Sequence, residues 1–141
     1  MKIPLTEDNL SLLNDKQREI VLTQWEKHQH KSHEVDYDVS GRGDIFEGFE
    51  VHENVFCPFL SSAQYIGSCL FYNNPLFDGG DVIDMGSGTG ILGVVMAKYG
   101  ARRVVATDIS KFAVANTKAN VKKFDLEDKV KIIQGDLFEN I

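Results

Sequence analysis

The stretch Val82-Ile-Asp-Met-Gly-Ser-Gly-Thr-Gly90 decides the fold of this chain. Its β-branched start predicts a short strand that ends in the carboxylate of Asp84. Glycines follow at positions 86, 88 and 90, and residues 91–98 are predicted to form a helix. This order suits a ligand that lies against bare backbone, because a Cβ would block its approach. A carboxylate two residues before the first glycine favours a cationic or hydroxyl-bearing ligand over a pyrophosphate.

Two further strands are predicted downstream, over residues 104–107 and 130–134. Ser110 is a suitable N-cap for a helix from about residue 111 to 124. Strands and helices that alternate with short connections predict a parallel sheet with right-handed crossovers. An acidic residue stands at the carboxyl end of each strand: Asp84, Asp108 and Asp136. Ligands of open parallel sheets bind at that edge, so the three acids mark a candidate site.

Four segments resemble, in order, the motifs of the class I S-adenosylmethionine-dependent methyltransferases: residues 82–93, 101–110, 113–120 and 135–138. The resemblance covers about residues 55–141 and leaves residues 1–54 as an N-terminal extension. It implies a partial Rossmann-like α/β sheet, made of strands 3-2-1 of the methyltransferase fold. The implied cofactor is S-adenosyl-L-methionine, and the implied reaction is methyl transfer to a nitrogen of a protein or of an RNA. The second and third segments look most like the protein-methylating members.

The resemblance also implies a role for individual residues. Asp84 and the backbone of the glycine loop would hold the methionine end of the cofactor. Asp108 would accept hydrogen bonds from the ribose hydroxyls, and Ile109 would pack on the adenine. Asp136 would bind the adenine N6, with Leu137 behind the ring. The full set of implied cofactor residues is Asp84, Gly86, Ser87, Gly88, Gly90, Asp108, Ile109, Asp136 and Leu137.

The segment before the first strand offers a possible cover for the cofactor. Val55-Phe-Cys-Pro58 resembles a segment that precedes the first motif in small-domain nitrogen methyltransferases, with Ser62 in a position that is often Thr. Ser61 or Ser62 is expected to cap a helix that runs to about Tyr72. A plain loop-to-helix junction explains the same residues equally well, so both interpretations stay open.

The catalytic part of the site is not found in this sequence. In the family, an Asn/Asp-Pro-Pro-aromatic motif follows the next strand, and nothing here matches it. No catalytic residue is therefore assigned, and methyl transfer of this kind calls for no metal. We expect either a fragment of a longer enzyme or a chain whose first strand has an open edge. Such an edge favours dimerisation, a partner strand or cover by the chain's own N-terminal segment.

Two other functions remain open on the sequence alone. Residues 88–93 match the G-x-G-x-x-G of dinucleotide-binding proteins, and Asp108 lies at a suitable distance for a ribose. Two features argue against an NAD-dependent oxidoreductase. Asp84 would lie close to the pyrophosphate of the dinucleotide, and residues 135–136 would have no role. A catalytically inactive cofactor-binding subunit or regulatory module also fits the intact cofactor motifs.

The composition is that of an ordinary soluble domain. The chain has 141 residues, 43% hydrophobic residues and a formal net charge of −6. An acidic balance disfavours unaided binding to a polyanion, so a protein substrate is favoured over RNA. No apolar run has membrane-spanning length and no apolar signal core is present. We therefore expect a cytoplasmic protein that does not enter a membrane.

The N-terminal extension is expected to contain helices and a hairpin. A short helix is predicted over residues 5–13, and Asn14 and Gln17 form a capping box for a second helix to about Lys31. Residues 35–51 alternate around a Ser40-Gly-Arg-Gly-Asp44 turn, which predicts a hairpin. This extension is expected to be a docking or substrate-side element.

Overall fold

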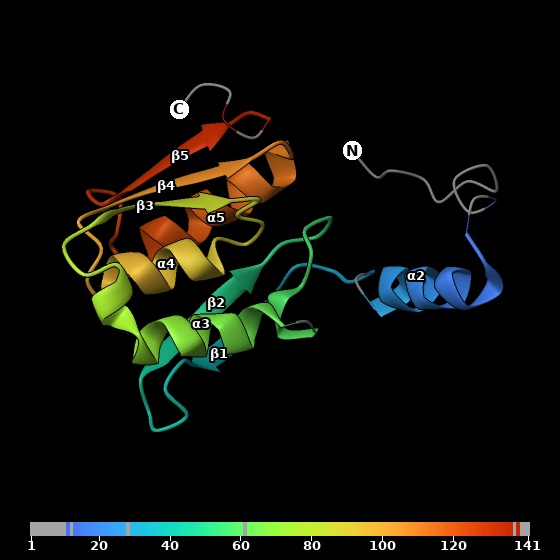
Figure 1. Ribbon diagram of the computed structural model, residues 1–141, viewed down its shortest axis with the longest axis horizontal. Coiled ribbons are helices and arrows are strands. Elements are labelled where there is room, and N and C mark those ends of the chain that lie inside the picture. The colour runs from blue at the N-terminus through green and yellow to red at the C-terminus, as the bar shows by residue number, and fades with distance from the viewer. Residues whose placement is uncertain (1–10, 12, 28, 61, 137, 139–141) are drawn as a thin grey trace.

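The computed structural model describes residues 11, 13–27, 29–60, 62–136 and 138 (Figure 1). The N-terminal elements are α2 (Asp15–Lys27), β1 (His33–Asp38), β2 (Ile45–Val51), η1 (Pro58–Leu60), α3 (Ala63–Tyr72) and η2 (Asn74–Leu76). The C-terminal elements are β3 (Asp81–Met85), α4 (Ile91–Lys98), β4 (Arg103–Asp108), α5 (Lys111–Lys123) and β5 (Val130–Gln134). The short helix predicted over residues 5–13 falls for the most part outside the described residues.

A parallel sheet with strand order β3-β4-β5 confirms the predicted α/β fold. Val82 pairs with Val104, and Val104 pairs with Val130, so the three strands are in parallel register. The crossover helices α4 and α5 both cover the same face of this sheet (Figure 1). Because the chain returns through a helix each time, the three carboxyl ends meet at one edge.

The predicted hairpin is also confirmed, as an antiparallel pair of β1 and β2 with an irregularity between Val35 and Tyr37. Its turn is organised by Asp38, whose carboxylate accepts hydrogen bonds from the amides of Ser40, Gly41 and Gly43. A short polar side chain that satisfies the turn amides in this way stabilises a tight connection.

The hairpin and the parallel sheet share one apolar core. Phe46 and Phe49 of β2 lie in the same buried cluster as Val94 of α4 and Val121 of α5. In Figure 1 the hairpin and α3 lie on the far side of α4 and α5 from the parallel sheet. The order of layers is therefore parallel sheet, helix pair, then hairpin with α3. The boundary proposed at residue 54 remains a prediction, although the side chains on its two sides pack together.

Strand β3 lies at the edge of the parallel sheet, since among the described residues it pairs with β4 alone. The side chains of Ile83 and Met85 are 46% and 37% exposed on the sheet face opposite the helices. The described part of the N-terminal segment forms its own sheet and does not add a strand to this edge. An apolar strand with one free edge and one uncovered face is a site for association.

Helix α2 stands apart from the rest of the molecule in Figure 1. Its predicted capping box is present: the amide of Asn14 donates to Oε1 of Gln17 at 3.0 Å, and the amide of Gln17 donates to Oδ1 of Asn14 at 2.9 Å. The helix ends at Lys27, four residues earlier than predicted. Among the residues that the structure describes, no helix combines the length and the apolar character needed to cross a bilayer.

Candidate cofactor site

The acidic residues predicted at the strand ends gather at one edge of the parallel sheet. Asp84 is the last residue but one of β3, Asp108 is the last residue of β4, and Met85 pairs with Thr107 beside them. The amide of Gly135, which follows β5, donates to the carbonyl of Asp108 at 3.2 Å. The glycine loop of residues 86–90 therefore begins on the same edge as the segment that carries Asp136.

The amides at the start of the glycine loop are satisfied by the protein itself. Gly86 and Ser87 both donate to the carbonyl of Thr107, at 2.8 and 2.9 Å. Gly88 donates to Oδ2 of Asp108 at 2.9 Å. A phosphate-binding loop needs such amides free to donate to an anion. The loop is therefore poorly suited to a pyrophosphate and presents acidic side chains instead.

One side of the loop, at Gly86 and Gly88, is open, and this side is called its front. The other side, called its back, packs closely against α5. A Cβ built on Gly86 meets no atom within 4 Å, and one on Gly88 meets only the carbonyl oxygen of Gly86 at 4.0 Å. A Cβ on Gly90, by contrast, would lie 2.8 Å from Cγ2 of Thr117. The hydroxyl of Ser87 is also turned inward and lies 3.1 Å from that of Thr117. A ligand can therefore approach Gly86 and Gly88, whereas Gly90 and the side chain of Ser87 serve the packing of the loop.

Asp84 is a buried carboxylate that has one hydrogen-bond donor among the described residues. It is 7% exposed, and its Oδ2 accepts a hydrogen bond from the amide of Gly93 in α4 at 2.9 Å. The pKa of Asp84 is raised to about 6, chiefly by burial; the Gly93 amide acts in the opposite direction, and the nearby Asp108 contributes a smaller rise. A buried charge with so few donors is stabilised by a neighbouring cation. The site thus favours a positively charged group beside Asp84.

Asp108 is partly exposed and joins three segments. Its Oδ2 accepts from the amide of Gly88, and its Oδ1 accepts from the amide of Ser110 at 2.9 Å. Ser110 caps α5 as predicted, with its hydroxyl accepting from the amide of Ala113 at 3.5 Å. Each carboxylate oxygen has a second lone pair, so the Asp108 carboxylate can still accept from a hydroxyl.

The residues expected near the adenine lie on the surface of the same edge. Ile109 is 67% exposed, directly after the strand that ends in Asp108. Asp136 is exposed as well, and Leu137 lies outside the described residues. An apolar side chain that is exposed next to a partly buried acid is a suitable platform for a flat ring that also carries hydroxyl groups.

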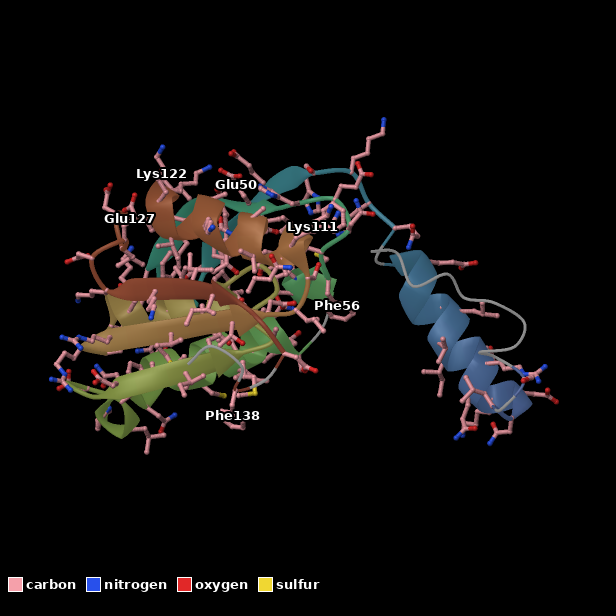
Figure 2. The ribbon with its side chains drawn as sticks, turned by 90° about the horizontal axis from the view of Figure 1, so that it is seen from above. Glu50, Phe56, Lys111, Lys122, Glu127 and Phe138 are labelled. Atoms are coloured by element: carbon pink, nitrogen blue, oxygen red, sulfur yellow. The ribbon has the colours of Figure 1, made fainter. Side chains whose placement is uncertain are left out.

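The predicted cover segment lies at the same end of the molecule as the arrowheads of β3, β4 and β5 (Figure 1). Pro58 is buried in it and Ser62 is exposed. Phe56 of this segment is 54% exposed and lies at the same end as Lys111, where α5 begins (Figure 2). Of the two caps expected for α3, Ser61 lies outside the described residues; Ser62 adopts a helical conformation and its side chain makes no cap hydrogen bond, so the capping role expected for it was wrong.

Three polar residues of α5 form the back of the site and were not predicted from the sequence. Asn116, Thr117 and Asn120 are 0%, 1% and 0% exposed. Two of them hold loop carbonyls: Thr117 donates to Gly88 at 3.1 Å and Asn120 donates to Thr89 at 2.9 Å. Thr117 and Asn116 lie three and four residues before Asn120, which places them on one helix face. This spacing of polar residues was the sequence signal that could have identified them.

A separate cavity of about 470 Å³ lies between the hairpin and α5. Its lining contains none of the predicted cofactor residues and consists of Ser32, His33, Glu34, Glu50, His52, Glu53, Phe112 and Ala115. Glu50 and His52 are paired at 2.8 Å, and Glu34 is paired with Lys123 at 2.6 Å. Within the described part of the chain, no group of three His, Cys, Asp or Glu residues is arranged to hold a metal ion.

Comparisons with known proteins agree with this geometry. Residues 68–141 match the family described as "Ribosomal protein L11 methyltransferase (PrmA)". The chain is similar to the ribosomal protein L11 methyltransferase of Desulforamulus reducens, with 38% identity over 74 residues, which are 52% of this chain and 24% of that protein. It is similar to the enzyme of the same name from Syntrophomonas wolfei, with 31% identity over 126 residues, which are 89% of this chain and 37% of that protein. Thus the chain spans about a quarter to two-fifths of the length of these relatives.

Among solved structures, the chain is similar to Trm5b from Pyrococcus abyssi, with a TM-score of 0.52 and 28% sequence identity. The likeness covers 63% of this chain and 26% of that one. It supports the arrangement of strands and helices described above.

Proposed function

This chain belongs to the ribosomal protein L11 methyltransferase (PrmA) family, and on that premise we propose that it is the cofactor-binding part of an S-adenosylmethionine-dependent methyltransferase. Membership of this family confirms the predicted resemblance to the class I methyltransferases. It also favours an enzyme over the dinucleotide-dependent and inactive alternatives. The activity, acceptor and partners of the whole protein are proposals here, because the chain spans only part of its relatives.

One observation carries the proposal: the open side of the glycine loop lies at the sheet edge that carries Asp84 and Asp108, and the first three loop amides already donate within the protein. Gly86 and Gly88 leave room for a ligand, and the amide of Gly88 is already held by Asp108. S-adenosylmethionine carries a sulfonium and an ammonium group, which carboxylates stabilise. A dinucleotide would place its pyrophosphate against the same carboxylates, which is unfavourable.

Different residues are assigned to the two ends of the cofactor. We assign the cationic methionine end to Asp84 and to the loop backbone of Gly86, Ser87, Gly88 and Gly90. The contributions of Gly90 and of the Ser87 side chain are indirect, because both pack against α5. Their function in this proposal is to keep the loop in shape.

The nucleoside end is assigned to the ends of β4 and β5. Asp108 would accept from the ribose hydroxyls through the lone pairs that the amides of Gly88 and Ser110 leave open. Ile109 would pack on the adenine, and Asp136 with Leu137 would complete that side. Pro58 and Ser62 are proposed as the cover, because their segment lies at the same end of the molecule (Figure 1).

Methyl transfer depends mainly on how the cofactor and the acceptor are oriented. The cofactor supplies a methyl group that is already activated, so the acceptor nitrogen must be placed in line with it and must lose a proton. The residues of this chain bind and orient the cofactor, and none of them is assigned to the removal of that proton. No metal is needed for this role.

The acceptor is proposed to be a protein. The family is named for a protein acceptor, ribosomal protein L11, and residues 101–120 resemble the protein-methylating enzymes. The formal net charge of −6 agrees with this choice, because binding to RNA depends largely on basic residues at phosphates. A cytoplasmic location, where such acceptors are made, is part of the same proposal.

Calorimetric titration tests the cofactor directly. We expect the protein to bind S-adenosylhomocysteine, the demethylated product of the cofactor, and to give no heat with NAD. Tight binding of NAD together with no response to S-adenosylhomocysteine would contradict the proposal. Asp128→Ala, which changes an exposed acid outside the site, is a suitable control and should bind as the unchanged protein does.

A further inference from the structure

Helix α5 presents a buried polar face to two different parts of the molecule. Asn116, Thr117 and Asn120 are each at most 1% exposed, in a layer that is otherwise largely apolar. Buried amides are costly unless each polar atom has a partner. Figure 2 shows Glu50 of β2 beside α5, whose ends are marked by Lys111 and Lys122. The partners of the asparagines lie in this strand and in the glycine loop.

On the hairpin side, the two asparagines take the place of a neighbouring strand. The amide of Glu50 donates to Oδ1 of Asn120 at 2.8 Å, and the amide of His52 donates to Oδ1 of Asn116 at 2.8 Å. The carbonyl of Glu50 accepts from Nδ2 of Asn116 at 2.9 Å and from Nδ2 of Asn120 at 2.8 Å. The free edge of β2 is thereby fastened to α5 through its backbone.

On the loop side, Asn120 makes a hydrogen bond to a described residue and Asn116 makes none. Nδ2 of Asn120 also donates to the carbonyl of Thr89 at 2.9 Å. The amide group of Asn120 thus has one acceptor and two donors in use, and it links the hairpin to the glycine loop. Asn116 makes equivalent bonds to the hairpin and none to the described residues of the loop, which makes it a natural control.

We propose that Asn120 is a positioning residue for the cofactor, because it sets the shape of the glycine loop against the hairpin. The loop has positive φ at Gly86, Gly88 and Gly90, so its backbone has many other conformations open to it. Asp108 holds the amide of Gly88 from the front, and Asn120 holds the next carbonyl, that of Thr89, from the back. The inference rests on the proposed function, since it concerns the same cofactor.

The test compares Asn120→Ala with Asn116→Ala in otherwise unchanged protein. Both variants lose hairpin bonds, but only the first loses the bond to Thr89. Loss of one buried hydrogen bond predicts that Asn120→Ala binds S-adenosylhomocysteine about fivefold more weakly than Asn116→Ala. Equal affinities would overturn the inference. Unfolding by denaturant, measured on both variants, separates this effect from a general loss of stability.

Amide hydrogen exchange without any cofactor supplies a second measurement. The amides of Gly88 and Gly90 should exchange faster in Asn120→Ala than in Asn116→Ala, while Gly41 and Gly43 in the hairpin turn should not change. Equal loop exchange in both variants would overturn the inference even if the unchanged protein binds the cofactor. Failure of the unchanged protein to bind would instead contradict the proposed function. If an alanine variant does not fold, Asn120→Ser and Asn116→Ser form the replacement pair.

Discussion

The hairpin and the parallel sheet differ in how completely they are covered. In β2 the buried residues Phe46, Phe49 and Val51 face α4 and α5, while Ile45 and Glu47 face outward. In β3 the side chains alternate too, with Val82 and Asp84 on the helix side, but two residues on the opposite side, Ile83 and Met85, are apolar and exposed. The hairpin pattern matches its single covered face, whereas the parallel strand has a pattern typical of strands buried on both faces.

The two sheets also differ in the direction in which the pKa of an acidic residue is shifted. Burial acts to raise the pKa of Asp38 in the hairpin turn, but hydrogen bonds from Gly43, Ser40 and Gly41 outweigh it and lower that pKa. At the end of β3, burial dominates and raises the pKa of Asp84 to about 6. Asp38 serves the turn that surrounds it, whereas the Gly93 amide only partly offsets the effect of burial on the charge of Asp84. An uncompensated buried acid is typical of a binding site.

The largest expected effect tests the covered sheet. Phe49→Ala should lower the free energy of unfolding by about 3–5 kcal/mol, because the ring is 0% exposed and its removal leaves a cavity. Ile45→Ala on the outward side of the same strand, 45% exposed, should cost under about 1 kcal/mol. Urea denaturation of both variants measures the difference. Similar losses for the two would show that the hairpin is not part of the shared core.

The second effect concerns the buried charge of Asp84. The folded pKa of about 6, against an ordinary 3.8, means that the folded state binds the proton more tightly than the unfolded state. Stability should therefore fall as pH rises from about 4 to about 6, by about 3 kcal/mol in all.

Asp84→Asn should remove this pH dependence and make the protein more stable at neutral pH while it weakens binding of S-adenosylhomocysteine. Stability curves over pH 4–8, followed by circular dichroism, provide the measurement. The same curve for the variant and the unchanged protein would mean that Asp84 is not desolvated.

The third effect concerns the ribose. Asp108→Ala should weaken binding of S-adenosylhomocysteine by at least about tenfold, because two charge-assisted hydrogen bonds to hydroxyls are lost. Asp108→Asn, which keeps an acceptor for one loop amide, should bind with intermediate affinity. Calorimetry on variants shown to be folded gives the values. An unchanged dissociation constant would mean that Asp108 acts only through the amides of Gly88 and Ser110.

The smallest effect on stability, but the sharpest test of the uncovered sheet, concerns β3. The 141-residue chain should associate through the edge and open face of this strand, so light scattering should give a mass above that of a monomer. Ile83→Lys should reduce the association and change the unfolding free energy by under about 0.5 kcal/mol. A monodisperse monomer that unfolds cooperatively, with fast hydrogen exchange at residues 82–86, would contradict the prediction.

Much of this fold could be read from local patterns. The β-branched runs before Asp84 and Asp108, the cap at Ser110 and the Asn14–Gln17 box each depend on a few neighbouring residues, and all are present in the structure. The cap expected at Ser62 failed, because a helix can begin on backbone geometry without the help of that side chain. The end of α2 was missed for a similar reason, since helix ends are set weakly by sequence.

The sequence by itself determined the parallel sheet, the glycine loop and the acids at its edge, because these follow from strand periodicity and from residue types that few backbone conformations accept. Only the tertiary structure decided which loop glycines have open space beside them and which pack against α5. It alone showed that Asn116 and Asn120 hold the hairpin, and that Asn120 also holds the loop. Those contacts join residues up to 70 positions apart, and a buried amide finds its partners only when distant segments have packed together.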